Sequence, residues 1–251
     1  MTERKHLREP PIVEVVCGFS FDAMAVLDPV AIGLYWHRRR QDFPAKQLHP
    51  AVGQAPGIVL GLGPLRTWLV SENGEHVVQV QQDRFYFNWR GRGARYPHFN
   101  TYEERGVLDR CLDEFVQFSA FCQEELGKRP APTGLELAKI DMLEQGRHWS
   151  DFTDLGRVVP ALSGLRSVLQ SPQPVLQMQM FEARGDREIH VQINNAVVTS
   201  TFVRGVQIET RIVASSSGEP RSTFSELNEM ANATFRALIP ETEWHRFGGV
   251  R

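Results

Sequence analysis

The chain has 251 residues, of which 41% are hydrophobic and 23% are charged, and this composition is typical of a soluble globular protein. Its formal net charge of −2 gives no overall reason to expect a nucleic-acid or anionic-membrane partner. No apolar run approaches the roughly 20 residues that span a bilayer, and the charged N-terminus lacks the hydrophobic stretch of a secretory signal, so we expect a cytoplasmic protein with no membrane partner.

The N-terminal half is predicted to begin with a strand, a helix and a loop. Residues 11–21 are rich in β-branched and aromatic side chains, which indicates a strand. Asp28 and Pro29 mark a helix start, because Asp caps free N–H groups and Pro suits the first helical position. This helix is expected to end near Phe43. Residues 44–64 contain four prolines and four glycines and are predicted to be a loop.

The stretch from 65 to 90 is predicted to form three antiparallel strands. Asn73 and Gly74 indicate a two-residue hairpin loop, since both residues tolerate positive φ angles. That loop sets Trp68 opposite Gln79. The resulting sheet has one apolar face and one face of amides, guanidinium groups and an indole.

A long helix is predicted over residues 102–126, where apolar residues recur at spacings of three and four. After Pro132 a similar order begins again, with a strand, an interrupted helical stretch, several strands and a last helix. The last helix is expected to open with the capping box formed by Thr223 and Glu226. The elements predicted between these points are a strand at 135–143, helical residues 152–169, and strands at 174–182, 188–194 and 206–214.

Both halves therefore run strand, helix, antiparallel strands, long helix. This order predicts a duplicated α+β protein with an extended antiparallel sheet backed by helices. The predicted domains are an N-terminal repeat over 1–129 and a C-terminal repeat over 130–251, packed as one compact unit. The best local match sets residues 77–81 beside residues 175–179.

Three segments resemble a sporadically distributed bacterial family of unknown function whose members are about as long as this chain. They are PPIVEVVCGFSF at 10–21, RTWLVSENGEHVVQVQQDRFYFNWRG at 66–91 and YPHFNTYEERGVLDRCLDEFVQF at 96–118. The resemblance brings no catalytic residues with it. Patchy occurrence is typical of mobile or defence-associated genes, so the resemblance implies a context in a prokaryotic defence system.

No motif for catalysis, metal binding or a cofactor stands out. The eight histidines lack an HExxH or paired spacing, and the chain has neither a phosphate-binding glycine loop nor a nucleophile elbow. Cys17, Cys111 and Cys122 are expected to be buried, reduced thiols. These features favour a non-enzymatic protein with no metal and no cofactor.

The candidate site is the polar face of the predicted sheet, where amides and guanidinium groups are able to bind a partner through hydrogen bonds. Aromatic residues combined with arginine are typical of interaction hot spots. The alternative interpretation is a merely solvated face, which antiparallel sheets commonly have. The candidate binding residues are Arg66, Trp68, Gln79, Gln81, Asn88, Arg90, Gln177, Gln179, His190 and Gln192.

We therefore expect a binding or assembly module that holds a protein partner or another copy of itself. The tail containing Trp244 and Phe247 is a second expected contact. One alternative is a small-ligand-binding or hydrolytic pocket between the two halves. The other is a nucleic-acid-binding subunit that uses Arg38–Arg40 and Arg90–Arg95, although acidic helix faces nearby argue against it.

Overall fold

The computed structural model describes residues 7–52, 65–92, 96–100, 105–167, 175–198, 201–215 and 218–249. Its helices are α1 (Pro29–Arg39), α2 (Val107–Leu126), α3 (Phe152–Val158) and α4 (Pro220–Leu238), with 3-10 helices η1 (Pro160–Ser167) and η2 (Glu241–Phe247). Its strands are β1 (Ile12–Phe21), β2 (Ala45–Pro50), β3 (Leu65–Val70), β4 (His76–Gln81), β5 (Arg84–Arg90), β6 (Pro132–Glu144), β7 (Gln177–Arg184), β8 (Arg187–Val198) and β9 (Val203–Ser215).

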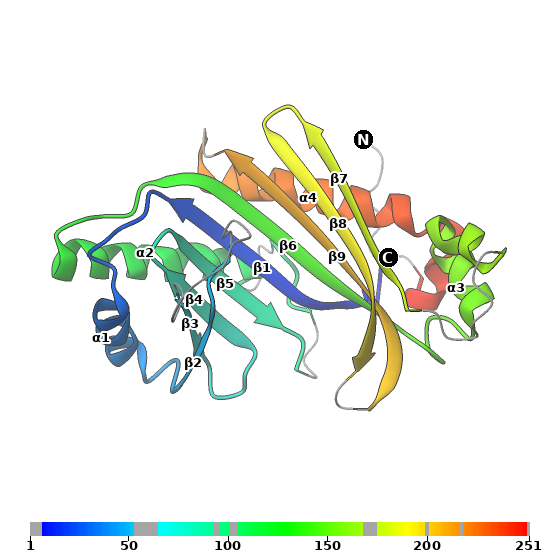
Figure 1. Ribbon diagram of the computed structural model, residues 1–251, viewed down its shortest axis with the longest axis horizontal. Coiled ribbons are helices and arrows are strands. Elements are labelled where there is room, and N and C mark those ends of the chain that lie inside the picture. The colour runs from blue at the N-terminus through cyan, green and yellow to red at the C-terminus, as the bar shows by residue number, and fades with distance from the viewer. Residues whose placement is uncertain are drawn as a thin grey trace. The chain divides into compact units, whose positions relative to one another are not determined.

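The nine strands form one antiparallel sheet in the order β2-β3-β4-β5-β1-β6-β9-β8-β7 (Figure 1). The predicted α+β class and the predicted antiparallel sheet are therefore confirmed. The duplication of two tandem repeats stays a prediction. Within the described residues, β2 and β7 are the edge strands of this sheet.

The chain divides into two compact units that are discontinuous in sequence. Unit 1 comprises Met1–Val13, Ala138–Ile212 and Asn228–Arg251, whereas unit 2 comprises Glu14–Leu137 and Val213–Leu227. These units are drawn by contacts and are not the predicted repeats 1–129 and 130–251, which stay a prediction. The units are discontinuous because β1, β6, β9 and α4 each contribute residues to both of them.

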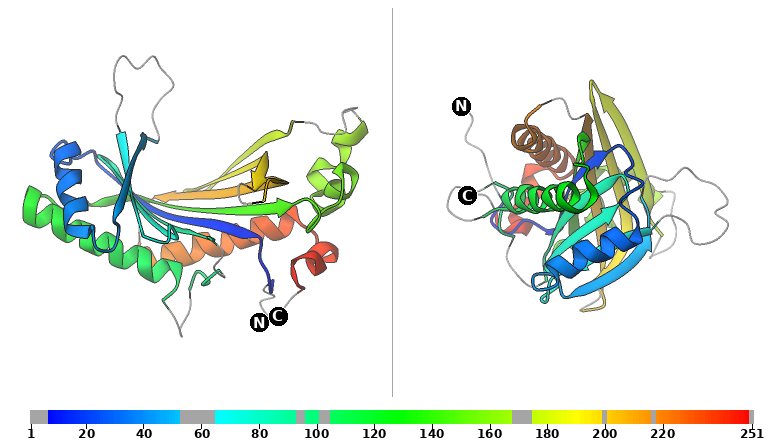
Figure 2. Two further views of the ribbon diagram at one scale, coloured as in Figure 1. Left: turned by 90° about the horizontal axis from the view of Figure 1, so that it is seen from below. Right: turned by 90° about the vertical axis from the view of Figure 1, so that its left-hand side faces the viewer.

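The core of unit 2 is an aromatic cluster between its strands and α2, which runs beside the sheet and contacts β5 (Figure 2). Phe19 on β1 stacks on Phe115 of α2 with ring centroids 3.8 Å apart. Phe118, one turn further along α2, meets Phe85 of β5 at 5.0 Å and Tyr35 of α1 at 5.4 Å. The apolar stripe predicted for the long helix is therefore the side that packs on the sheet.

The start of α1 agrees with the sequence. Asp28 accepts hydrogen bonds from the N–H groups of Val30 and Ala31 at 2.9 and 2.8 Å, and Pro29 occupies the first helical position. The helix ends at Arg39, earlier than predicted. The carbonyl of Arg39 accepts the N–H groups of Asp42 and Phe43 at 3.0 and 2.9 Å, so one further turn follows the helix and brings the chain to the predicted end at Phe43.

Two other helix starts differ from the predictions. Residues 101–104, where α2 was expected to begin, lie outside the described residues, and the helix begins at Val107, whose N–H is satisfied by His98 O at 3.2 Å. Helix α4 begins at Pro220, so the capping box predicted at Thr223 is wrong. Glu219 caps this end instead, because its carboxylate accepts the N–H of Ser222 at 2.8 Å.

The register of the β3–β4 hairpin is confirmed, since Trp68 pairs with Gln79. The predicted loop conformation is wrong, because only Gly74 has a positive φ, of 72°, and Asn73 does not. The side chain of Asn73 instead accepts hydrogen bonds from Ser71 Oγ at 2.9 Å and from Glu75 N at 3.1 Å. A side chain that closes the turn replaces the second left-handed residue.

Part of the predicted loop 44–64 is a strand. Residues 45–50 form β2, which pairs with β3 so that Gln47 lies opposite Trp68. The strand carries little apolar side-chain area and ends at Pro50, so only its pairing with β3 defines it. Residues 53–64, including the rest of the predicted loop, lie outside the described residues.

The C-terminal tail belongs to the interior of unit 1, so its predicted role as a free contact is wrong. Trp244 and Phe247 are both buried in η2. The indole of Trp244 donates to Ile239 O at 3.0 Å, and the ring of Phe247 stacks on His148 with centroids 5.1 Å apart. The contact between Phe247 and His148 joins residues far apart in the sequence, so no local pattern predicts it.

No helix in the described part of the chain combines the length and apolar character that crossing a membrane requires.

Candidate functional site

The predicted site residues fall into two groups, one in each unit. The group in unit 2 lies on β3, β4 and β5, and the group in unit 1 lies on the β7–β8 hairpin. The unit 2 residues are Arg66, Trp68, Gln79, Gln81, Asn88 and Arg90, and the unit 1 residues are Gln177, Gln179, His190 and Gln192.

In unit 2 the three predicted amides are buried, so the expectation that they face solvent is wrong. Gln79, Gln81 and Asn88 expose only 3%, 4% and 2% of their surface. The amide of Gln79 donates to Asn88 Oδ1 at 2.6 Å, and Asn88 donates to the Glu14 carboxylate. Gln81 bonds both backbone groups of Val52, while Gln79 Oε1 has no partner among the described residues. These amides form an internal network and leave no free binding surface.

Trp68 is the centre of a compact aromatic and cationic group in unit 2. The ring of His49 stacks on it with centroids 4.0 Å apart, and the guanidinium carbons of Arg90 and Arg66 lie 4.6 and 5.4 Å from its ring centroid. Arg90 is held in turn by Glu14 at 3.3 Å. Arg66, Trp68 and Arg90 lie together, as predicted. Both guanidinium groups pack against the indole ring.

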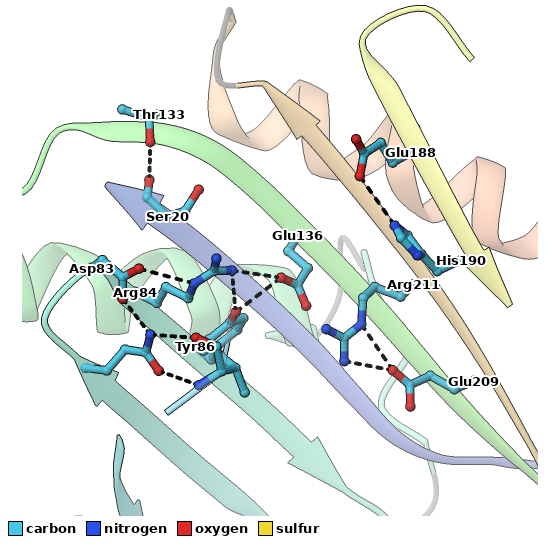
Figure 3. Close-up of polar contacts among 12 residues, drawn as sticks. Ser20, Asp83, Arg84, Tyr86, Thr133, Glu136, Glu188, His190, Glu209 and Arg211 are labelled. Carbon is cyan, nitrogen blue, oxygen red and sulfur yellow. Dashed lines mark hydrogen bonds and ion pairs between the residues drawn. The ribbon is translucent and has the colours of Figure 1, made fainter. Parts of the chain in front are cut away.

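A second polar group in unit 2 was missed by the sequence analysis. Tyr86 of β5 extends across β1, and its hydroxyl donates to Glu136 of β6 at 3.1 Å, while Arg84 donates to the same hydroxyl at 3.2 Å (Figure 3). Burial, and next the nearby Glu136 carboxylate, raises the pKa of Tyr86 to about 12. Tyr86 has room to cross β1 because the residue opposite it is Gly18. A glycine within a run of bulky strand residues is the sequence signal for such a close approach.

Gly18→Ala is expected to destabilise the protein by about 1–3 kcal/mol, the usual cost of overpacking a core. A Cβ at this position would lie 2.3 Å from the Tyr86 ring, which would displace the ring from Glu136. Gly33→Ala is the matched control, since its Cβ meets no atom within 4 Å and alanine favours the helix α1. Chemical denaturation measures both, and equal effects at the two positions would contradict this account.

In unit 1 the predicted residues share an exposed face of the β7–β8 hairpin. Gln179 pairs with Gln192, and Gln177 and Gln179 are exposed while His190 and Gln192 are half-buried. Phe181 lies on the same face opposite His190, with ring centroids 4.9 Å apart, and 61% of its surface is exposed. His190 also contacts Glu188 at 3.4 Å (Figure 3). The sequence predicted the amides of this face but missed its aromatic residue.

The free edge of β7 is the second exposed feature of this hairpin. β7 pairs with β8 on one side and has no neighbouring strand on the other among the described residues. Asn195 N donates to Leu176 O at 3.0 Å, so every second residue from Leu176 bonds to β8. The N–H and C=O groups of Gln177, Gln179, Phe181 and Ala183 therefore point to the open edge.

Three of the arginines in the predicted basic clusters are paired with carboxylates. Arg38 pairs with Glu124 and Glu125, and the mostly buried Arg39 pairs with Glu114 at 2.6 Å. Arg90 contacts Glu14, and residues 93–95 lie outside the described residues. Neutralised arginines have little attraction left for phosphate, which weakens the nucleic-acid alternative.

The titratable groups with shifted pKa values are held by the fold. Burial raises the pKa of Asp141 to about 7 against the opposing effect of Lys139, which donates to Asn232 at 2.7 Å. Burial lowers the pKa of His148 to about 4, and its Nδ1 accepts the N–H of Glu144 at 2.9 Å. Across the described ranges, no three His, Cys, Asp or Glu side chains gather in a group able to hold a metal ion.

Comparison with known proteins gives no match: no family model, no curated protein and no solved structure resembles this chain significantly. The resemblance to a sporadic bacterial family therefore stays an expectation.

Proposed function

We propose that the protein is a non-enzymatic binding or assembly module, and that it holds another copy of itself or a partner protein at the β7–β8 hairpin. The observation that carries this proposal is the open edge of β7, where the backbone groups of four residues, the exposed Phe181 among them, meet no other strand of the described chain. Strand addition to such an edge is a general mode of protein recognition. A role in prokaryotic defence rests on the family resemblance alone.

Self-association is supported by the sequence of β7 itself. Two β7 strands paired antiparallel about Met180 set Gln179 opposite Phe181 and Glu182 opposite Met178, so no like charges face each other. Gln179 and Phe181, which lie opposite each other in this register, both direct their backbone N–H and C=O groups to the open edge. Antiparallel pairing requires this match. Met180, with 38% of its surface exposed, then gains a partner at the centre.

Gln179→Pro is the test of this proposal. The N–H at Gln179 points to the open edge, so proline removes a donor from the edge without breaking a bond to β8. The wild-type chain is expected to sediment as a dimer, and Gln179→Pro to weaken association by about tenfold or more. Gln179→Ala is the matched control, because it keeps the N–H.

A wild-type chain that stays monomeric and retains no partner from its host would refute the proposal. Equal association of the proline and alanine variants would refute the role of the β7 edge while leaving another interface open. Circular dichroism checks that both variants are folded.

We also infer that the chain is a duplication. The proposal is supported by the strand order, which reads β3-β4-β5-β1 from one side and β7-β8-β9-β6 from the other, with α2 and α4 following the corresponding strands in sequence. The local match of 77–81 with 175–179 does not support it, because those segments belong to strands that do not correspond. Superposition of β1 to α2 on β6 to α4 tests this inference, and unlike paths of the two segments would refute it.

A further inference from the structure

Unit 1 contains a cavity of about 410 Å3 that plays no part in strand addition. It lies among α3, the residues before β7, the end of β8 and the start of β9. Its size is within the range of small-molecule sites in proteins. Most of its lining is apolar and is provided by Trp149, Phe152, Leu155, Leu176, Val197 and Val206.

The uncharged polar side chains at this cavity are already engaged by the protein. Asn195 Oδ1 accepts the N–H of Leu176, and Gln145 Nε2 donates to Ser150 O at 2.8 Å. The indole N–H of Trp149 donates to Leu143 O at 2.8 Å. Each of these side chains is thus held by the protein through one of its atoms, which orients the lining.

The two charged residues of the lining differ in whether the protein already binds their side chains. Asp151 caps α3, and its carboxylate accepts the N–H groups of Thr153 and Asp154 at 2.8 and 2.9 Å. Arg204 lines the cavity, and its guanidinium makes no hydrogen bond or ion pair with any described residue. Arg204 is therefore the charged group of this cavity that is available to a ligand.

We infer that the cavity binds a carboxylate attached to an aromatic or branched aliphatic group. The apolar lining takes the hydrocarbon part, whose burial provides most of the affinity. The carboxylate pairs with Arg204, because a guanidinium matches a carboxylate with two parallel hydrogen bonds. A free small acid and the C-terminal residue of a peptide share this chemistry.

Matched acids and amides test the inference by calorimetric titration of the full chain. The probes are 4-phenylbutyrate, N-acetyl-leucine and a hexapeptide ending in leucine, each compared with its amide. We expect at least one acid to bind about tenfold more tightly than its amide, as a charge-assisted hydrogen bond predicts. A tighter peptide points to a protein C-terminus, and a tighter small acid points to a metabolite.

Two variants assign the binding to the cavity. Arg204→Gln is expected to abolish the preference for acid over amide, whereas the control Arg184→Gln, on an arginine paired with Glu182 outside the cavity, leaves it unchanged. Val197→Trp fills the cavity mouth from a side chain that is 54% exposed, so it is expected to block binding without unfolding the protein.

The inference is overturned if no acid binds, if acid and amide bind alike, or if either cavity variant binds as the wild type does. Sedimentation of the same samples keeps this result separate from the β7 proposal. If the chain associates but binds no probe, the cavity inference fails. If the chain binds a probe but does not associate, the β7 proposal fails.

Discussion

Asp154→Ala is expected to lower the free energy of unfolding by about 3–5 kcal/mol, the usual cost of breaking a buried ion pair. Asp154 is 4% exposed and binds Arg246 through both carboxylate oxygens, at 2.8 and 3.0 Å. It also accepts the N–H of Ser150 at 2.8 Å. Arg246 lies in η2, so this pair fixes the C-terminal segment to the rest of unit 1. Its loss removes both bonds to Asp154 and leaves Arg246 with Glu243 at 2.6 Å and with His148 O at 3.0 Å.

The pH dependence of the same variant follows from the sign of the pKa shift. Burial acts to raise the pKa of Asp154, but hydrogen bonds from Arg246 and Ser150 outweigh it and hold the pKa below its usual value of 3.8. A depressed carboxyl pKa contributes stability that is complete above the unfolded pKa and is lost as the pH falls through the folded one. The difference between wild type and Asp154→Ala is therefore expected to shrink below about pH 4.

Urea denaturation at pH 7 and at pH 3 measures both effects. Glu182→Ala is the matched control, because the Glu182–Arg184 pair is exposed and such pairs contribute about 0–1 kcal/mol. A loss at Asp154 no larger than that at Glu182 would contradict the structural role of the pair.

The sequence predicted those features that short-range chemistry determines. Asp28 and Pro29 define the start of α1 because capping involves neighbouring N–H groups only. The Trp68–Gln79 register follows from a turn five residues away. The long helix ends at Leu126, the predicted last residue, and Gly127 follows it with a left-handed φ of 68°.

Features that depend on distant segments were not predictable. Strand alternation shows that Gln79 and Gln81 share a face, but it does not show whether that face is covered. Here Glu14 and Val52, far along the chain, bond to Asn88 and Gln81 and bury the network. The alternation of polar and apolar residues along a strand is the same whether the polar face is covered or not. The sequence therefore predicted correctly which residues share a face, but wrongly that this face meets solvent.

The same limit explains the candidate site. Gln177, Gln179, His190 and Gln192 were grouped correctly, because a hairpin with a short turn sets their pairing. Phe181 was missed because an aromatic strand residue is expected to be buried, and only the position of β7 at the sheet edge exposes it. Arg204 was missed because a sequence does not reveal that its guanidinium has no partner among the residues that the structure describes.

Phe118→Ala is expected to be as costly as Asp154→Ala for a different reason, and to lower the free energy of unfolding by about 3–5 kcal/mol. Phe118 is fully buried in unit 2, where it meets the rings of Phe85, Tyr35 and Phe21. These partners come from two strands and a helix, so no single shift closes the cavity that alanine leaves.

Val116→Ala on the same helix is the control, since Val116 is 65% exposed and the change is expected to stay within about 0.5 kcal/mol. Chemical denaturation of the two variants measures the difference. Comparable losses would mean that the aromatic cluster is not the core of unit 2. If Phe118→Ala is costly but leaves the sedimentation of the native protein unchanged, the stability of unit 2 and association at β7 are separate properties of the chain.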